Sequence, residues 1–395
     1  MTTLATPARK AAAIFLLMTM TILGVFPLDV ILPSFPSMAA QFGTSVANIA
    51  LSVSLFSIGL SLSLLLIGPL SDNLGRKRLL MIGMSIAVAG SAGCAMADDF
   101  GWFLFFRVVQ AVGCGSFVLS QALVQDLFVG KEQERLRIAI VSAGGICISV
   151  SPLFGSWLQS WLDWRGSFQV FVIIGLVVIL KAWLLLESPG AAPSSSIPIL
   201  KAYQQVFSDQ RFVGYWLISA LAFACHFAFI VVSPIILMEQ LALTPYQFSL
   251  VLLLYGAAYV LGGMGAGWMN RWMDGNTQIV TGQRLIAMAG VLMLLVYNVW
   301  GLSVITVMIP MILCTAGTTI TRPIATSRAM GLFPKSAGTS ASAGNVIIFL
   351  SGGLISGLVS QSGEQVMTVL PITFLVLSAI GMGLNARVQR SAHMS

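Results

Sequence analysis

Charge is what this sequence lacks most. Only 8% of its 395 residues are charged, whereas 57% are hydrophobic, and the mean hydropathy is +0.94. A soluble domain carries about 25% charged residues, so these values exclude an ordinary water-soluble protein and predict integration into a membrane. Apolar runs of about 20 residues recur, and each is long enough to cross roughly 30 Å of hydrocarbon as a helix.

Motifs for nucleotide-driven and hydrolytic chemistry are also missing. There is no GxxxxGK[ST] phosphate loop, no HExxH pair and no nucleophile elbow. The five cysteines all fall inside apolar runs and form no CxxC pair, which indicates neither a disulfide framework nor a metal site. We therefore expect no metal, no cofactor and no enzymatic activity, and an ion gradient as the energy source.

Twelve membrane-spanning helices are predicted from the apolar runs. Their approximate ranges are 11–33, 46–69, 79–97, 101–124, 136–158, 166–186, 212–237, 246–269, 284–301, 303–323, 337–360 and 366–386. A stretch rich in proline and serine, Ser188–Pro198, leaves six spans on each side. The sequence thus predicts an all-α membrane protein of two six-helix bundles, 1–188 and 211–395, joined by a cytoplasmic linker at 189–210. Two six-helix halves are a plan used by transporters, which bind their substrate near the membrane midplane between the halves.

Basic residues gather in alternate connections and at the termini. They are Arg9, Lys10, Arg76, Lys77, Arg78, Lys131, Arg135, Arg137, Lys201, Arg211, Arg271, Lys335, Arg387 and Arg390. The opposite connections hold Arg165 with Asp98, Asp99, Asp163, Glu239 and Glu364. Because cytoplasmic loops carry the excess of Lys and Arg, both termini are expected in the cytoplasm. The net charge of +7 is accounted for in this way, without a nucleic-acid partner.

Two ionisable residues of opposite sign lie in the outer half of the predicted membrane region. Asp29, between Pro27 and Pro33, lies about 27 Å along the first span at a rise of about 1.5 Å per residue. Arg107 lies early in the fourth span, which enters from outside. A carboxylate and a guanidinium at one depth can pair, and a proton can compete with that pair. The alternatives are a solvated aspartate at the outer end of its helix and an arginine that reaches the outer interface.

His226 is a third ionisable residue inside a span, surrounded by aromatic residues. It titrates near neutral pH in its unperturbed state, which allows a role with protons or substrate. The alternative is a neutral, hydrogen-bonded packing residue.

The connection around residues 68–78 combines glycines with charges. Gly68 and Gly75 allow close approach and a tight turn, while Arg76 can reach Asp72 or Asp126. Such contacts would form a latch on the cytoplasmic side that is made in one state and broken in the other. The alternative is a basic loop that only fixes topology.

The fifth span carries Pro152 and Gly155. Proline and small residues permit a bend and close helix contact. A conformational hinge and simple packing remain equally open.

Three of these segments resemble signatures of the major facilitator superfamily. The run Gly68-Pro-Leu-Ser-Asp72-Asn-Leu-Gly75-Arg76-Lys77-Arg78 resembles its loop signature GxLaDrxGrkxxl. The run from Arg107 to Gly113 resembles the RxxqGxg signature of its proton antiporters, with Ala111 in place of the first glycine. The run Ser151–Ser156 resembles the antiporter motif GPxxGG, with serine in place of one glycine on each side.

The closer resemblance is to the bicyclomycin-resistance (Bcr/CflA) type of drug/proton antiporter. The segments that carry it are Pro27–Pro36, Gln125–Phe128, Arg211–Tyr215, Leu221–Ala224, Ser233–Pro234 and Ala337–Ser342. This resemblance implies alternating access, with Asp29 and Arg107 as the proton-coupling pair. It also implies a cytoplasmic charge relay formed by Asp72, Arg76 and Asp126.

The sequence therefore predicts a monomeric exporter in the bacterial inner membrane that exchanges protons for small amphipathic compounds. The expected substrate contacts are Phe26, Gln110, Phe223, His226 and Asn345. Nineteen methionines favour a drug-like range of substrates. Two alternatives remain: a dedicated exporter of one siderophore, sugar or amino-acid derivative, and a membrane sensor that transports nothing.

Overall fold

The computed structural model describes residues 7–186, 199–269, 271–333 and 337–393. Every regular element within these ranges is helical. The elements are α1 (Pro7–Asp29), η1 (Leu32–Ser34), α2 (Phe35–Phe42), α3 (Val46–Leu74), α4 (Arg76–Met96), α5 (Phe100–Cys114), η2 (Gly115–Val118), α6 (Leu119–Leu127), α7 (Gly130–Leu162), α8 (Arg165–Leu185), α9 (Ile199–Ser208), α10 (Gln210–Pro234), η3 (Ile235–Gln240), α11 (Pro245–Met269), α12 (Gly275–Trp300), α13 (Val304–Leu332), α14 (Ala337–Ser360), η5 (Gly363–Gln365) and α15 (Val366–His393).

Eleven helical segments in the described ranges are long and apolar enough to cross a membrane. Four of these spans contain more than one helical element: α1 with η1 and α2, α5 with η2 and α6, α10 with η3, and η5 with α15. Helix α7 is the twelfth long helix, with 33 residues, and it packs against α1 and α11. The prediction of an all-α membrane protein with twelve spans is confirmed.

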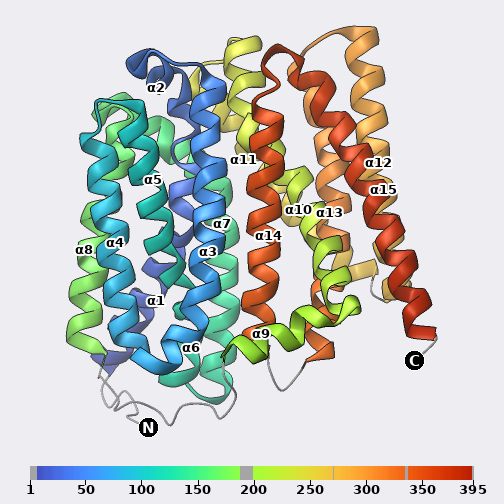
Figure 1. The fold of residues 1–395 in the computed structure, drawn as a ribbon. Coiled ribbons are helices and arrows are strands. Elements are labelled where there is room, and N and C mark those ends of the chain that lie inside the picture. Colours follow the sequence, from blue (N-terminus) through green and yellow to red (C-terminus); the bar gives the residue numbers. More distant parts are fainter. Residues whose placement is uncertain (1–6, 187–198, 270, 334–336, 394–395) are drawn as a thin grey trace.

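The helices form two bundles that stand side by side (Figure 1). One bundle contains α1 to α8 and the other α10 to α15. Both ends of the described chain lie at the same face of the molecule, here named the terminal face, and the other is the opposite face. The short helix α9 runs across the terminal face, so the second part of the predicted linker is helical. The first part of that linker, residues 187–198, lies outside the described residues.

The helices are longer than the predicted spans on the terminal side. Helix α3 continues to Leu74 and α13 to Leu332, whereas the apolar runs ended near 69 and 323. Hydropathy detects only the part of a helix in hydrocarbon, and these helices extend beyond it. The predicted loop at Gly68 and Asp72 is therefore wrong, because both residues belong to the last turns of α3.

Gly75 alone forms the turn between α3 and α4. Its φ of 79° lies in the left-handed region that glycine adopts without steric cost. Of the predicted glycines in this segment, Gly75 is thus the one with a required backbone conformation.

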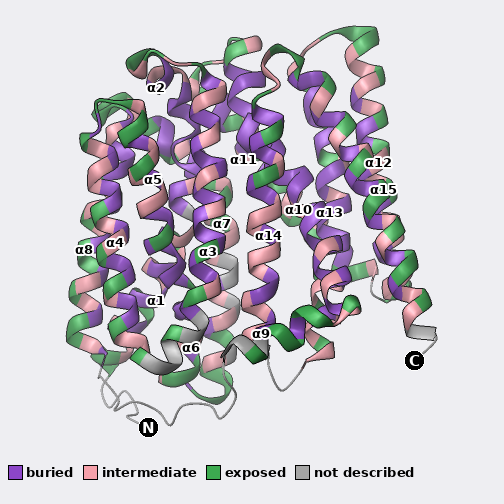
Figure 2. Cartoon of the chain, viewed as in Figure 1, coloured by how far each residue is buried: buried purple, intermediate pink, exposed green. Residues whose placement is uncertain are grey.

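Burial follows the two-bundle arrangement (Figure 2). Helix α10 is buried along nearly its whole length, whereas α8, α11 and α12 expose large apolar side chains. Examples of such exposed side chains are Leu180, Leu254, Leu261, Leu295 and Val299. A soluble protein rarely leaves so much contiguous apolar surface in water, so these faces fit a hydrocarbon environment.

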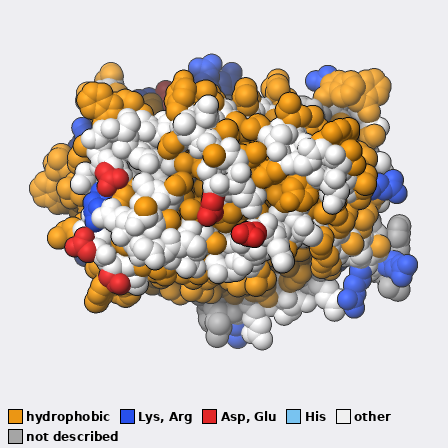
Figure 3. Space-filling view, turned by 90° about the horizontal axis from the view of Figure 1, so that it is seen from above, with side chains coloured by type: hydrophobic (Ala, Val, Ile, Leu, Met, Phe, Trp, Pro, Cys, Tyr) orange, Lys and Arg blue, Asp and Glu red, His pale blue; other side chains and the backbone are white. Residues whose placement is uncertain are grey.

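The opposite face carries acidic side chains. Figure 3 looks onto this face, where acidic groups are scattered and the visible Lys and Arg groups lie towards the edge of the outline. Asp99 caps the start of α5 there by accepting hydrogen bonds from the backbone N–H groups of Gly101 and Trp102, at 2.8 and 3.2 Å.

Candidate functional site

Asp29 is the last residue of α1. Pro33 has no N–H to donate to the carbonyl of Asp29, so the α-helix stops there and continues as η1 and α2. The Asp29 side chain is buried, with 8% of its surface exposed. No hydrogen bond or ion pair to another described residue reaches its carboxylate. A buried carboxylate without a partner is costly in a membrane, which keeps Asp29 as a candidate functional residue.

Arg107 is completely buried in α5. Its Nη2 donates to the carbonyl oxygen of Pro27 at 3.0 Å, and its Nη1 donates to Gln110 Oε1 at 2.7 Å. The guanidinium also lies over the rings of Phe56 and Phe168, at 4.5 and 5.7 Å from their centroids. An arginine held in this way does not reach the outer interface, so that alternative is excluded for this structure.

The Arg107 contacts continue into two more helices. Gln110 Nε2 donates to Ser91 Oγ of α4 at 3.1 Å, and Ser91 Oγ donates to the carbonyl of Phe168 in α8 at 3.0 Å. The Gln110 amide is thus used inside the N-terminal bundle, where it orients Arg107 instead of being free for a substrate. Together these bonds join α1, α5, α4 and α8.

Asp29 and Arg107 do not form an ion pair in this structure. They are connected through the backbone instead, because Arg107 holds the Pro27 carbonyl two residues before Asp29. The Arg107 Nε is buried and has no hydrogen-bond partner. Two ionisable side chains of opposite sign therefore lie in the N-terminal bundle without an ion pair between them.

Pro152 and Gly155 lie where α7 touches two other helices. A Cβ built on Gly155 would stand 1.9 Å from the carbonyl oxygen of Val30, the residue after Asp29. The Pro152 carbonyl accepts a hydrogen bond from Ser249 of α11 at 2.8 Å. The predicted hinge thus contacts both the Asp29 segment and the other bundle.

Phe223 and His226 lie together on α10 in the C-terminal bundle. Phe223 stacks on Phe227 and meets the Phe349 ring of α14 edge-on, with ring centroids 5.2 and 5.8 Å apart. His226 Nδ1 lies 2.6 Å from the Tyr255 hydroxyl, which accepts a hydrogen bond from Thr315 at 2.7 Å. The Tyr255 hydroxyl thus connects His226 of α10 with Thr315 of α13.

Arg322 of α13 joins this aromatic group, and the sequence analysis missed it. Its Nη1 donates to the Tyr259 hydroxyl at 3.2 Å, and its guanidinium lies 4.7 Å from the centroid of Phe223. The predicted span ended at residue 323, so Arg322 looked like a boundary residue. A longer helix would have revealed an arginine about 15 Å from the end of α13, at a rise of about 1.5 Å per residue.

Phe26 and Asn345 differ in their surroundings. Phe26 is buried and packs on Phe154 of α7, with ring centroids 6.1 Å apart, so its contacts are internal to the N-terminal bundle. Asn345 is half-buried on α14 and makes no hydrogen bond with another described residue.

Arg76 contacts Asp126 at the terminal face. Its Nη1 donates to the Asp126 carboxylate and to the carbonyl of Ala122. Arg76 thus joins the start of α4 to the end of α6. The predicted partnership of these two residues is present. The side chain of Asp72 lies outside the described part of the structure.

The two bundles meet along α3 and α14. Three hydrogen bonds cross this contact, here named the α3–α14 seam: Ser54 with Ser356 at 2.8 Å, Ser57 to the Phe349 carbonyl at 2.8 Å, and Ser342 to the Leu64 carbonyl at 2.7 Å.

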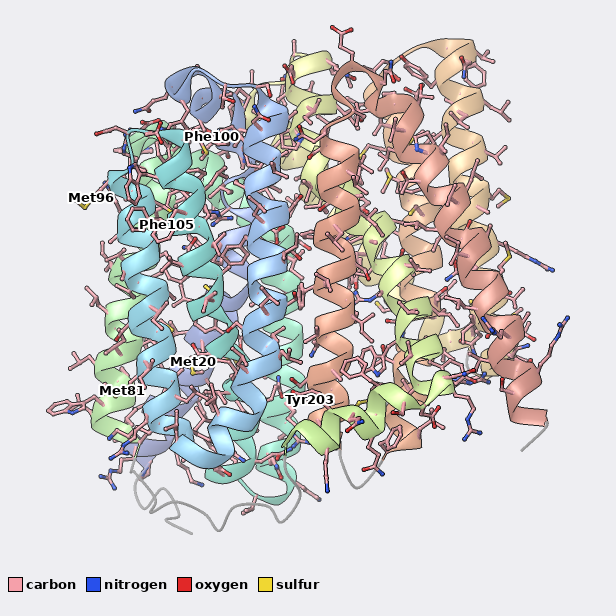
Figure 4. All side chains as sticks on the ribbon, in the orientation of Figure 1. Met20, Met81, Met96, Phe100, Phe105 and Tyr203 are labelled. Carbon is pink, nitrogen blue, oxygen red and sulfur yellow. The ribbon has the colours of Figure 1, made fainter. Side chains whose placement is uncertain are left out.

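Helix α9 adds a contact to this seam. The Tyr203 hydroxyl donates to the Leu65 carbonyl at 3.1 Å and lies 3.0 Å from Ser342 Oγ. Figure 4 labels Tyr203 at the terminal end of α14. The linker thus touches both bundles.

A second contact between the bundles, the α7–α11 seam, involves Ser149. A Cβ on Gly256 would stand 2.2 Å from its Oγ. Two helical bundles that meet along two seams, with buried ionisable side chains inside, are the architecture of a membrane transporter.

Comparison with known proteins gives the family. Residues 13–357 match the model of the Major Facilitator Superfamily. The chain therefore belongs to this superfamily of transporters.

Relatives of similar length are drug-resistance proteins. A chloramphenicol resistance protein of Pseudomonas aeruginosa is 26% identical over 95% of this chain and 90% of its own length. The multidrug resistance protein MdtL of Klebsiella pneumoniae is 24% identical over 93% of this chain and 94% of its own.

Solved structures share the fold. A bacterial homologue of the lysosomal transporter Spinster, in an inward-facing and occupied conformation, superposes with a TM-score of 0.73 at 14% identity, over 97% of this chain and 98% of its own. A D-xylose–proton symporter gives 0.73 at 15% identity, over 94% of this chain and 97% of its own.

Proposed function

We propose that this transporter exports small amphipathic compounds from the bacterial cytoplasm in exchange for protons, as a member of the Bcr/CflA type. The observation that carries the proposal is the buried, unpartnered carboxylate of Asp29 at the break of α1. A carboxylate in this position binds and releases a proton as access to it changes. The drug-resistance names of two relatives support export of drug-like compounds.

In this proposal the terminal face is cytoplasmic, because the basic connections lie there. The substrate enters between the bundles from that side, and the bundles then rock about their seams. Protons load Asp29 from outside and leave inside, while Arg107 holds the Pro27 carbonyl and so fixes the helix end that presents Asp29. One chain contains both bundles, and we infer that it works as a monomer.

Substrate-dependent proton movement tests this function. The purified protein is reconstituted into lipid vesicles with an imposed pH gradient, and chloramphenicol and other drugs are added while a pH-sensitive dye is followed. We expect drug addition to release protons and a proton gradient to drive drug uphill. If no drug in the panel moves protons above the level of protein-free vesicles, the antiport proposal is wrong.

The Arg76–Asp126 contact predicts a kinetic effect. Replacing Asp126 by Asn should slow turnover by about two- to fivefold, because partly exposed ion pairs contribute about 0.2–1 kcal/mol, and equilibrium drug binding should be unchanged. The exchanged pair Arg76→Asp with Asp126→Arg should recover part of the rate. A loss of membrane insertion in Asp126→Asn would instead indicate a role in topology alone.

A further inference from the structure

Arg322 is an intramembrane cation that the proton cycle does not use. It is half-buried, its Nη1 is bonded to Tyr259, and its Nε is buried with no hydrogen-bond partner. The Nε and Nη2 edge of a guanidinium is one of the two forks that match an oxyanion with two parallel hydrogen bonds. In Arg322 that edge makes no hydrogen bond with another described residue.

The carboxylates of the C-terminal bundle lie at or beyond the ends of its membrane spans. The four acidic residues of that bundle are Asp209, Glu239, Asp274 and Glu364. They precede α10, end η3, precede α12 and lie in η5. An arginine inside a membrane normally pairs with an acidic group or a carbonyl. The C-terminal bundle places no carboxylate beside Arg322, so its charge has no anionic partner among the described residues.

The surroundings of Arg322 face the N-terminal bundle. Phe223 contacts Phe349, and the carbonyl of Phe349 accepts the hydrogen bond from Ser57 across the α3–α14 seam. On the other side, Tyr259 is on α11, one turn after Gly256, which touches Ser149 across the α7–α11 seam. Through Phe223 and Tyr259, Arg322 is therefore linked to helices of both seams.

The neighbours of Arg322 suit an aromatic acid. The rings of Phe223 and Phe227 offer a stacked apolar surface, and the Tyr259 hydroxyl is a polar group at its edge. The His226 ring lies beside Tyr259, with ring centroids 5.1 Å apart, and adds a further polar ring. Donors and rings of this kind recognise a negatively charged group attached to a flat apolar body.

We propose that Arg322 binds the carboxylate, or another oxyanion, of the exported compound while the apolar part of that compound lies on Phe223. This proposal rests on the export function and specifies its substrate class as amphipathic aromatic acids. Arg322 is then the specificity-determining residue of the C-terminal bundle, and Asp29 serves the proton in the other bundle.

Equilibrium binding to the protein in phosphatidylcholine nanodiscs tests the proposal without any gradient. The probes are 2-naphthoate and its uncharged analogue 2-naphthamide, which share one ring system. We expect naphthoate to bind more tightly, and Arg322→Gln to weaken naphthoate binding at least about tenfold, since hydrogen bonds to charged groups are stronger than neutral ones. Naphthamide binding should change by less than about twofold.

Two further variants separate recognition from structure. Arg322→Lys retains the charge without the fork and should lose part of the naphthoate affinity. Arg328→Gln is the matched control on α13, because Arg328 makes a similar contact with a tyrosine, Tyr215, at 3.3 Å, but lies nearer the terminal face. It should leave both probes unaffected.

The result that would overturn the proposal is equal affinity of the wild type for both probes, no naphthoate binding, or an equal loss of both probes in Arg322→Gln. These binding measurements need no proton movement. They can therefore be interpreted even if the protein does not exchange protons, and a negative binding result does not affect the antiport test.

Discussion

Replacing Asp29 by Asn is expected to abolish uphill export driven by a pH gradient, while downhill movement of the drug continues. Asparagine has nearly the same shape but cannot carry a proton, so the proton step is lost and the substrate path is retained. Since Asp29 makes no hydrogen bond or ion pair with another described residue, the replacement breaks no contact in the structure. The protein should therefore fold and bind drug as the wild type does.

The measurement is drug accumulation in vesicles across a series of imposed pH gradients. Asp99→Asn is the matched control, because Asp99 caps α5 outside the buried region and asparagine caps a helix about as well. This control should keep full coupling. Unchanged pH dependence in Asp29→Asn would remove the proton role from Asp29.

Replacing Gly155 by Ala is expected to have the second large effect. A Cβ at this position would stand 1.9 Å from the Val30 carbonyl oxygen, which is backbone and cannot rotate away. Helix α7 must therefore move away from α1 next to Asp29. Overpacking of this kind costs about 1–3 kcal/mol, so we expect a lower midpoint of thermal inactivation in detergent together with impaired export.

Gly145 of the same helix provides the control for this experiment. A Cβ at Gly145 meets nothing within 4 Å, so Gly145→Ala should leave the inactivation midpoint equal or higher, because alanine favours helix more than glycine. Equal behaviour of the two variants would mean that the contact between α7 and α1 does not constrain the transporter.

The sequence alone predicts the membrane spans, their division into two bundles, and the location of Asp29 and Arg107 inside the membrane region. These follow from hydropathy and from the cost of charge in lipid, both of which act locally along the chain. The Arg76–Asp126 contact was also predicted, because both residues end helices at one face.

The partners of Arg107 were not predictable in the same way. Its hydrogen bond to the Pro27 carbonyl requires α1 to end at Asp29 and α5 to pack beside α1. This packing depends on tertiary structure and cannot be read from the local sequence. The same holds for His226 with Tyr255 and Thr315, which come from three helices. Arg322 was missed for a simpler reason, because hydropathy places the end of a span where polar residues begin.

The hydrogen bonds of the α3–α14 seam join hydroxyl groups to one another and to backbone carbonyls. None of the bonds described above along that seam includes an ionised group, so dissolved salt does not screen them. The Arg76–Asp126 contact, in contrast, is an ion pair that is partly open to solvent. Raising the ionic strength therefore weakens the Arg76–Asp126 contact and leaves the hydrogen bonds of the α3–α14 seam intact. A salt titration thus separates the contribution of the ion pair from that of the seam to the rate at which the bundles separate, without any substitution.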